Sequence, residues 1–203
     1  MGLFIVALSG ATTAVFGLGY KIRKHYGFSI IHLSFLFSVS IIIFALIYIL
    51  IYGHPFYSKA SLMIGTPIGV CFALAIYFYQ QVLEKANLNI SWTVIQFSVL
   101  IPFFFSMIAY HERPSIQAII GVVLIFVSII LFGIKKERTR QSAIPDIKTA
   151  LFLFFAAFLS GVNDAFAKVY VSSFNGESPF SLFLYTGITM SVITGIILLH
   201  SKE

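Results

Sequence analysis

Long apolar runs separated by short polar connectors dominate the chain. Seven such runs occur, at residues 3–20, 29–52, 61–83, 90–110, 115–134, 149–171 and 180–200. Each has about the 20 mostly apolar residues that a helix needs to cross a bilayer. The runs do not alternate polar and apolar residues, as the strands of a membrane barrel would. In lipid every backbone amide needs an internal partner, so the pattern predicts about seven transmembrane helices.

The connectors differ in length and charge, and one of them divides the chain. Those at residues 53–55, 112–114 and 176–179 are short, and each contains a proline. The short link at 112–114 predicts that the fourth and fifth helices form an antiparallel hairpin. Residues 135–148 form the longest and most basic connector. We therefore predict a five-helix unit at 1–134, a basic cytoplasmic linker at 135–148 and two further helices at 149–203.

The composition explains where these helices lie. Hydrophobic residues make up 59% of the 203 residues and charged residues 10%, whereas a soluble domain carries about 25% charged residues. A soluble fold of this size could not bury so much apolar surface. The bilayer is therefore the expected environment, and the chain is predicted to be a multi-pass protein of the cell membrane. The net charge of +6 lies mostly in connectors and indicates topology, not a nucleic-acid partner.

Lysine and arginine fall mainly on one side of the predicted topology. Ten of the 13 lie in the first, third and fifth connectors and after the last run, while Lys59 and Arg113 lie on the other side. Lys168 lies inside the sixth run. Because cytoplasmic connectors carry the excess of positive charge, the pattern predicts that Met1 lies outside.

The segment after the basic linker repeats features of the beginning of the chain. Residues 9–14 read SGATTA and residues 160–165 read SGVNDA, and Phe-Ser opens the following run in both copies. A five-helix repeat is odd, so a second copy would enter the membrane inverted, as in many secondary transporters. Only two helices of that second copy are present. We expect either a fragment or truncated form of a ten-helix protein, or a chain that completes its bundle with another chain, for instance as a dimer.

Four residues near the end of the first unit follow a recognisable order. Pro102 lies within the fourth run, Glu112 lies at its exit, and Gln117 and Gly121 open the fifth run. This order resembles the EamA-like family of the drug/metabolite transporter superfamily. The family often has a second glycine further along this helix, where the chain has Ser128.

The sixth run resembles the helix that opens the repeat of the same family. That helix often reads Gly-x-Asn-x-x-x-x-Lys, which Gly161, Asn163 and Lys168 fit, whereas the first run keeps only Gly10. The resemblance covers essentially the whole chain and implies a carrier of metabolites, amino acids or drugs. Many relatives place the N-terminus inside, against the charge bias here, and we keep the orientation that the charges predict.

Asp164 and Lys168 are the most informative residues of the sixth run. They lie four residues apart and so on one face of the predicted helix. A charge inside the bilayer costs at least about 2.5–3.5 kcal/mol on insertion scales. With Asn163 they are candidates to line a substrate pathway, Lys168 for an anionic group and Asp164 for a cation or proton. The alternative is an ion pair near the membrane surface, with Lys168 reaching outward.

The fourth and second runs carry further pathway candidates. Trp92 and Gln96 lie one turn apart, and Pro102 can kink their helix because it removes a backbone hydrogen bond. A kinked helix of this kind suits a substrate cavity. Alternatively, Trp92 is an interfacial anchor and Gln96 bonds a neighbouring helix. His32 is either a buried, hydrogen-bonded histidine or part of a proton route.

Three glycines, a proline and a glutamate have expected structural roles. Gly65 and Gly69 flank Pro67 as a small-xxx-small pair, which favours close helix packing; a flexible break for alternating access is the alternative. Glu112 is expected to fix its turn by accepting hydrogen bonds from the first amides of the next helix. Gly121 belongs to the same structural set.

The pattern gives no sign of an enzyme. It contains no phosphate loop, no His-Glu-x-x-His and no Gly-x-Ser-x-Gly, and its five histidines are scattered. No catalytic residue, metal or cofactor is therefore predicted. A small-molecule secondary transporter is the leading interpretation, with proton or cation coupling left open. A seven-helix receptor and an intramembrane enzyme remain as alternatives, although residues 180–200 lack the lysine that a retinal protein needs.

Overall fold

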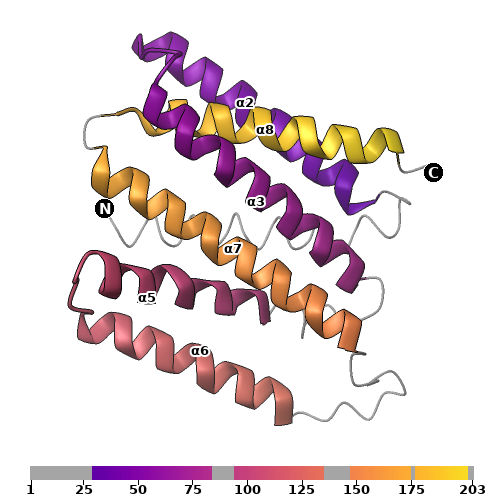
Figure 1. Cartoon of the computed structure of the whole chain (residues 1–203), viewed down its shortest axis with the longest axis vertical. Coiled ribbons are helices and arrows are strands. Elements are labelled where there is room, and N and C mark those ends of the chain that lie inside the picture. Colours follow the sequence, from indigo (N-terminus) through magenta and orange to yellow (C-terminus); the bar gives the residue numbers. More distant parts are fainter. Residues whose placement is uncertain (1–28, 84–93, 135–146, 175–176, 201–203) are drawn as a thin grey trace.

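The computed structural model describes residues 29–83, 94–134, 147–174 and 177–200. All regular structure in these ranges is helical (Figure 1). The elements are α2 (Ile30–Tyr52), α3 (Lys59–Leu83), the 3-10 turn η1 (Gln96–Val99), α5 (Leu100–Ala109), α6 (Ile116–Ile134), α7 (Ile147–Ser173) and α8 (Pro179–His200). The predicted first helix at 3–20 and most of the basic linker lie outside the described residues.

Four of these helices have the length and composition of membrane spans. They are α2, α3, α7 and α8, while η1 with α5 and the described start of α6 are shorter apolar helices. The 27 residues of α7 extend over about 40 Å at 1.5 Å per residue, more than the roughly 30 Å of a bilayer's hydrocarbon core. Large apolar side chains also face outward, such as Phe44, which is 62% exposed, and Leu50, which is 67% exposed. The chain is therefore an all-helical, membrane-embedded protein.

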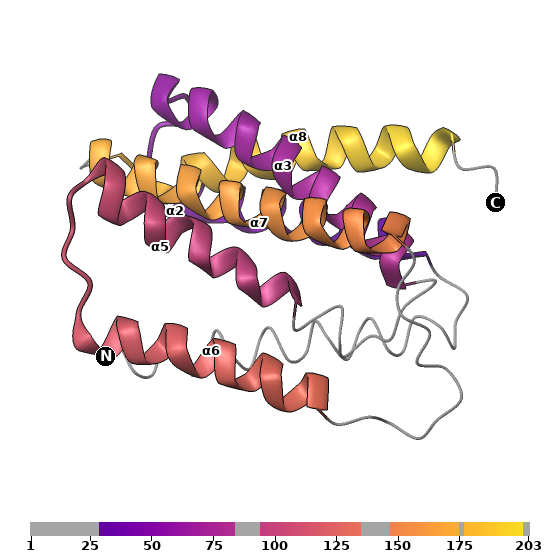
Figure 2. The same cartoon turned by 60° about the horizontal axis from the view of Figure 1, so that its bottom comes forward.

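The four long helices form the packed part of the structure. α3 contacts both α7 and α8, α8 also packs on α2, and η1 with α5 packs on the other side of α7. The turned view shows α6 lying apart from this group, beyond α5 (Figure 2). Its described side chains are largely exposed, with Ile116 at 77% and Leu124 at 58%. Its ring contact between Phe126 and Phe97 nevertheless ties it to η1.

The contacts show how the helices run relative to one another. Ser61 of α3 meets Tyr170 near the end of α7, and Phe78 meets Phe152 near its beginning, so these helices are antiparallel. Gly65 and Gly69 instead follow α8 in the same direction, from Leu182 to Met190. If successive spans cross the membrane in opposite directions, α3 and α7 must be antiparallel and α3 and α8 parallel. The observed contacts agree with both. The turns at 53–58, 110–115 and 174–178 consequently lie at one end of the bundle.

Small residues allow α8 to lie close to α3. A Cβ atom added to Gly69 would lie 2.7 Å from the Thr186 carbonyl oxygen, and one added to Gly65 would lie 3.0 Å from that of Leu182. Both distances are shorter than ordinary van der Waals contact, so only glycine fits this crossing. Pro67 lies between them, yet α3 stays one continuous helix from Lys59 to Leu83. The expected small-residue pair therefore lies at a close helix crossing.

Hydroxyl groups add polar bonds between the same helices. The Ser38 and Ser191 hydroxyls lie 2.7 Å apart between α2 and α8, and the Thr186 hydroxyl donates to the Gly65 carbonyl at 3.3 Å. At the end with the three turns, the Tyr170 hydroxyl lies 2.9 Å from that of Ser61. Such hydrogen bonds between helices are worth about 1 kcal/mol each in membranes. They supplement the packing without forming a site.

Candidate functional site

A 3-10 segment within the helix before Pro102, which we call the helix break, is the first feature of the candidate site. Residues 96–99 form a 3-10 turn, in which the Leu100 amide donates to the Phe97 carbonyl three residues back. Pro102 has no amide hydrogen, so it cannot supply the α-helical bond to the Ser98 carbonyl. The helix therefore tightens just before the proline. Such 3-10 segments within a helix often mark functional hinges or strain.

Gly161 of α7 lies directly against this break. A Cβ atom at Gly161 would lie 2.5 Å from the Ser98 carbonyl oxygen and 2.5 Å from the Cδ1 atom of Ile101. The carbonyl that lacks its usual helical donor thus faces the one residue type that leaves room for it. Gly161 matches the family pattern in the sequence, but its contact with η1 is visible only in the structure.

Gly161, Asp164, Lys168 and Ser172 follow one another along the side of α7 that faces α5. Their spacing of three, four and four residues places them on one side of the helix. We call these four residues the polar row. Gly161 contacts η1 and α5 at one end of the row. The Ser172 hydroxyl closes the other end by donating to the Lys168 carbonyl at 2.8 Å.

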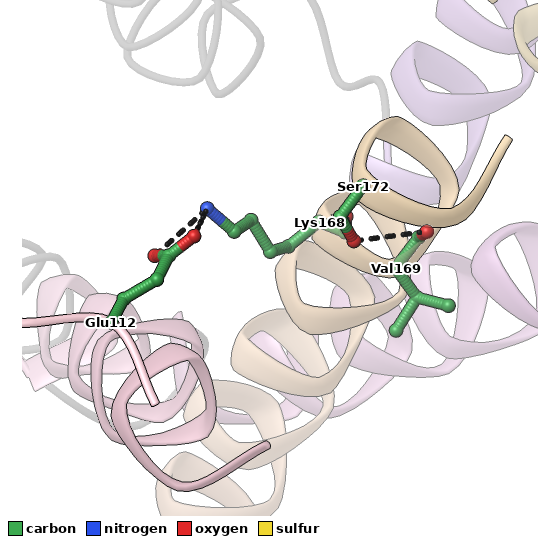
Figure 3. Close-up of polar contacts among 4 residues, drawn as sticks. All are labelled: Glu112, Lys168, Val169 and Ser172. Atoms are coloured by element: carbon green, nitrogen blue, oxygen red, sulfur yellow. Dashed lines mark hydrogen bonds and ion pairs between the residues drawn. The ribbon is translucent and has the colours of Figure 1, made fainter. Parts of the chain in front are cut away.

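Lys168 pairs with Glu112 across two elements. Its Nζ atom lies 2.8 Å from Oε1 and 3.0 Å from Oε2 of Glu112 (Figure 3). The side chains are 34% and 49% exposed, so water and salt screen the pair and its net contribution to stability is at most about 1 kcal/mol. Its larger consequence is geometric, because it ties α7 to the turn between α5 and α6.

Asp164 has no such partner in the part of the chain that the structure describes. Among the described residues, neither a hydrogen bond nor an ion pair reaches its carboxylate, and its side chain is exposed. Lys168, four residues further along the same side, is turned toward Glu112 instead. Asp164 lies nine residues before the end of α7 at Ser173, which is about 13 Å along the axis. A single carboxylate thus lies well inside an apolar membrane helix.

The turn that carries Glu112 is shaped by His111. His111 adopts a left-handed backbone with φ of 51°, which few residues other than glycine do. This conformation lets the Glu112 amide donate back to the Ser106 carbonyl at 3.3 Å. At the start of α6 it is the Ser115 hydroxyl that accepts from the Ala118 amide, at 3.2 Å. Glu112 therefore fixes the turn by pairing with Lys168, and the expected capping role belongs to Ser115.

The other candidates predicted from sequence lie apart from the polar row. His32 is exposed in the first turn of α2, at the opposite end of the bundle, with its Nδ1 atom 2.7 Å from the Ser29 hydroxyl. Gln96 is exposed on η1. Asn163 precedes Asp164 by one residue and so points about 100° away from it; its Oδ1 atom is buried without a hydrogen-bond partner. Trp92 lies outside the described residues.

A shallow hollow adjoins the Glu112 side of the ion pair. Its volume is about 230 Å³. Phe103, Ser106 and Met107 of α5 line one wall, and residues 112–115 with Ala118 line the other. The hollow therefore lies between α5 and the beginning of α6, beside the turn that joins them. Gly121, further along α6, has open space around its Cα atom.

Comparison with known proteins assigns no function. No protein-family model, no curated protein and no solved structure matches the chain. The residues of the polar row and the helix break beside it therefore carry the functional proposal.

Proposed function

We propose that the chain is a secondary transporter of small molecules, or a part of one, and that the polar row of α7 lines its pathway. In this proposal the chain has seven spans, a five-helix unit followed by the first two helices of an inverted copy. The EamA-like order of Pro102, Glu112, Gln117 and Gly121 supports this view. The observation that carries the proposal is the carboxylate of Asp164, which lies inside a membrane helix and has no partner among the described residues.

Asp164 supports the proposal because an ionised carboxylate inside a membrane helix is energetically costly. An ionised side chain within the hydrocarbon is expensive, by about 2.5–3.5 kcal/mol even on the lowest scales, and such residues usually face a wet cavity or a ligand. The nearest cation along α7, Lys168, is held by Glu112. No described residue is a partner of Asp164, so water, a proton or a ligand can meet its carboxylate on the exposed side of α7. A pathway along the polar row provides such an environment.

The helix break next to the row fits the same function. Transporters commonly build their sites where a membrane helix is interrupted, because the freed backbone groups can bind ligands and the helix can bend there. Here the helix stays continuous but narrows to the 3-10 segment η1, which contacts Gly161, one turn from Asp164. A movement of α5 about Pro102 would therefore change access to Asp164 directly.

Transport by the reconstituted chain tests this proposal. We would follow a pool of radiolabelled amino acids and, separately, the dye ethidium in liposomes carrying a pH gradient in either direction. Asp164→Asn keeps the size of the side chain and should reduce the flux of the transported probe at least about tenfold, equivalent to about 1.4 kcal/mol. The matched control is Glu177→Gln, which removes an exposed carboxylate from the turn after α7 and should leave the flux within about twofold.

Two results would count against the proposal. Unchanged flux in Asp164→Asn, at equal amounts of reconstituted protein, would exclude the polar row as the pathway. Absence of any gradient-driven flux by the wild-type chain, for every probe, would contradict the proposal that this chain by itself is a transporter.

A further inference from the structure

Lys168 lies within reach of two carboxylates and is paired with one of them. Its ammonium contacts both oxygens of Glu112, at 2.8 and 3.0 Å. Asp164 precedes it by four residues, and an acid four residues before a lysine is the favourable order for an ion pair within a helix. Only a change in the torsion angles of the Lys168 side chain separates the two pairings. The structure therefore shows one of two competing arrangements.

The observed arrangement decides which ligand charge the row can accept. Lys168 is already neutralised, so an anion would gain little from it and would be repelled by Asp164. Asp164 is a hydrogen-bond acceptor without a donor among the described residues. A cation that donates hydrogen bonds supplies both missing elements, the charge and the donor.

We infer that Asp164 is a binding site for a cationic hydrogen-bond donor, a proton or a protonated amine, and that Lys168 is its built-in competitor. The inference rests on the proposed transporter function for its physiological meaning. While Glu112 holds Lys168, Asp164 is open to the external cation. When Lys168 turns to Asp164, it displaces the cation and breaks the Lys168–Glu112 ion pair that holds α7 to the α5–α6 turn. Cation binding at Asp164 and formation of the Lys168–Glu112 ion pair are thereby coupled.

The remaining charged and titratable groups near α7 do not replace these three. α5 itself has no titratable residue, and the turn after it carries Tyr110, His111, Glu112 and Arg113. Hydrogen bonds with Ser172 and Ser173 lower the pKa of Tyr110, which places its phenol at the end of the row. On the opposite side of α7, α3 contributes Lys59, Cys71, Tyr77 and Tyr79. Among the described groups, Glu112 is the one that pairs with a charge of the row.

Infrared titration of the purified chain in detergent tests the inference without any need for transport. The signal is the C=O stretch of a protonated carboxyl that is present in the wild type and missing in Asp164→Asn. Lys168→Met should raise the proton affinity that this band reports, because the competitor is removed. Glu112→Gln should lower it, because Lys168 is freed to pair with Asp164. Each change should be about tenfold or more, as expected for one opposite charge at contact distance.

The proton affinity should rise in one variant and fall in the other, which distinguishes a lysine that moves between two carboxylates from a purely structural ion pair. Loss of a purely structural pair would shift the proton affinity in the same direction whichever partner is removed. The double variant should behave like Lys168→Met, since Glu112 acts only through Lys168. Shifts of the same sign in both single variants, or no band that Asp164→Asn removes, would overturn the inference. Each variant is compared at equal monodispersity and helical content, so a misfolded protein is recognised as such.

Methylammonium chloride, against sodium chloride at equal ionic strength, identifies the kind of cation. If a protonated amine occupies the site, methylammonium should shift the titration midpoint of the wild-type carboxyl band to lower pH in a saturable way. Asp164→Asn should show no such shift. If no shift occurs while the three variants behave as stated, the proton is the ligand. A normal titration in a chain that shows no flux would leave the cation site standing and contradict the transporter function alone.

Discussion

The ion pair between Lys168 and Glu112 determines which carboxylate near α7 is neutralised. The pair joins two segments 56 residues apart and leaves Asp164 without its nearest cation. Both side chains are partly exposed, so the pair contributes little to stability. Its importance lies in which carboxylate receives the lysine.

A double-mutant cycle measures the energy of this pair. Lys168→Met, Glu112→Gln and the double variant should show a coupling of roughly 0.2–1 kcal/mol in the free energy of unfolding, as exposed ion pairs do. The coupling should shrink as salt is added. Reversible unfolding in mixed micelles provides the measurement. Strictly additive effects at low salt would show that the two charges do not interact in the folded chain.

At the scale of helices, glycines and prolines decide how closely the elements approach. Gly65 and Gly69 bring α3 against α8, and Gly161 brings α7 against the break before Pro102. In each case one of the nearest atoms is a backbone carbonyl oxygen, which cannot move aside without shifting its whole helix. These positions therefore respond to a single added methyl group.

Gly69→Ala should destabilise the protein by roughly 1–3 kcal/mol, the usual cost of overpacking. The added Cβ would lie 2.7 Å from the Thr186 carbonyl oxygen. Gly121→Ala in α6 is the matched control, because nothing lies within 4 Å of its Cβ position and alanine is the better helix former by about 1 kcal/mol. In detergent, the thermal unfolding midpoint should therefore fall in Gly69→Ala and rise in Gly121→Ala. Equal effects of the two substitutions would contradict the close crossing of α3 and α8.

Pro102→Ala should separate stability from function. The new amide at position 102 can donate to the Ser98 carbonyl, so the 3-10 turn should relax toward a regular α-helix. The thermal midpoint should stay the same or rise, whereas the flux of the transported probe should fall. Ile101→Ala, at the neighbouring position, removes packing against Gly161 but leaves the break. Full transport by Pro102→Ala would show that the break has no part in function.

For the whole molecule, alternation of the helices fixes which turns share an end. The turns at 53–58, 110–115 and 174–178 lie together, as the bond between the Ser181 hydroxyl and the Pro55 carbonyl shows for two of them. This end carries few basic residues, and the positive-inside rule predicts that it faces outward. The orientation itself remains a prediction from sequence.

Labelling with a membrane-impermeant maleimide tests that orientation. In a background with Cys71→Ala, cysteines at Arg113 and Glu177 should react in intact cells. A cysteine at Lys148, exposed at the beginning of α7, should react only after permeabilisation. The reverse pattern would show that Met1 lies inside. Labelling of all three positions in intact cells would contradict the alternation of the helices.

The sequence predicts five of the described helices to within two residues at each end, for example 29–52 against Ile30–Tyr52 and 149–171 against Ile147–Ser173. It anticipated a kink from Pro102 but not the 3-10 turn that precedes it. It placed Asp164 and Lys168 on one face, where an ion pair within the helix was the simplest alternative. It missed Glu112 as the partner, although strict alternation already put both charged groups at the same end of the bundle.

The sequence determines some of these features and the tertiary structure decides the others, because the interactions behind them differ in range along the chain. Lipid requires each spanning segment to satisfy its own backbone, so apolar length and turn residues determine the helices locally, and the sequence alone was sufficient for the membrane environment and for the four long spans that the structure describes. The partner of Lys168, the surroundings of the close-packed glycines and the lack of a partner for Asp164 among the described residues depend on how separate helices pack. Those contacts join residues distant in the chain, and only the tertiary structure could decide them.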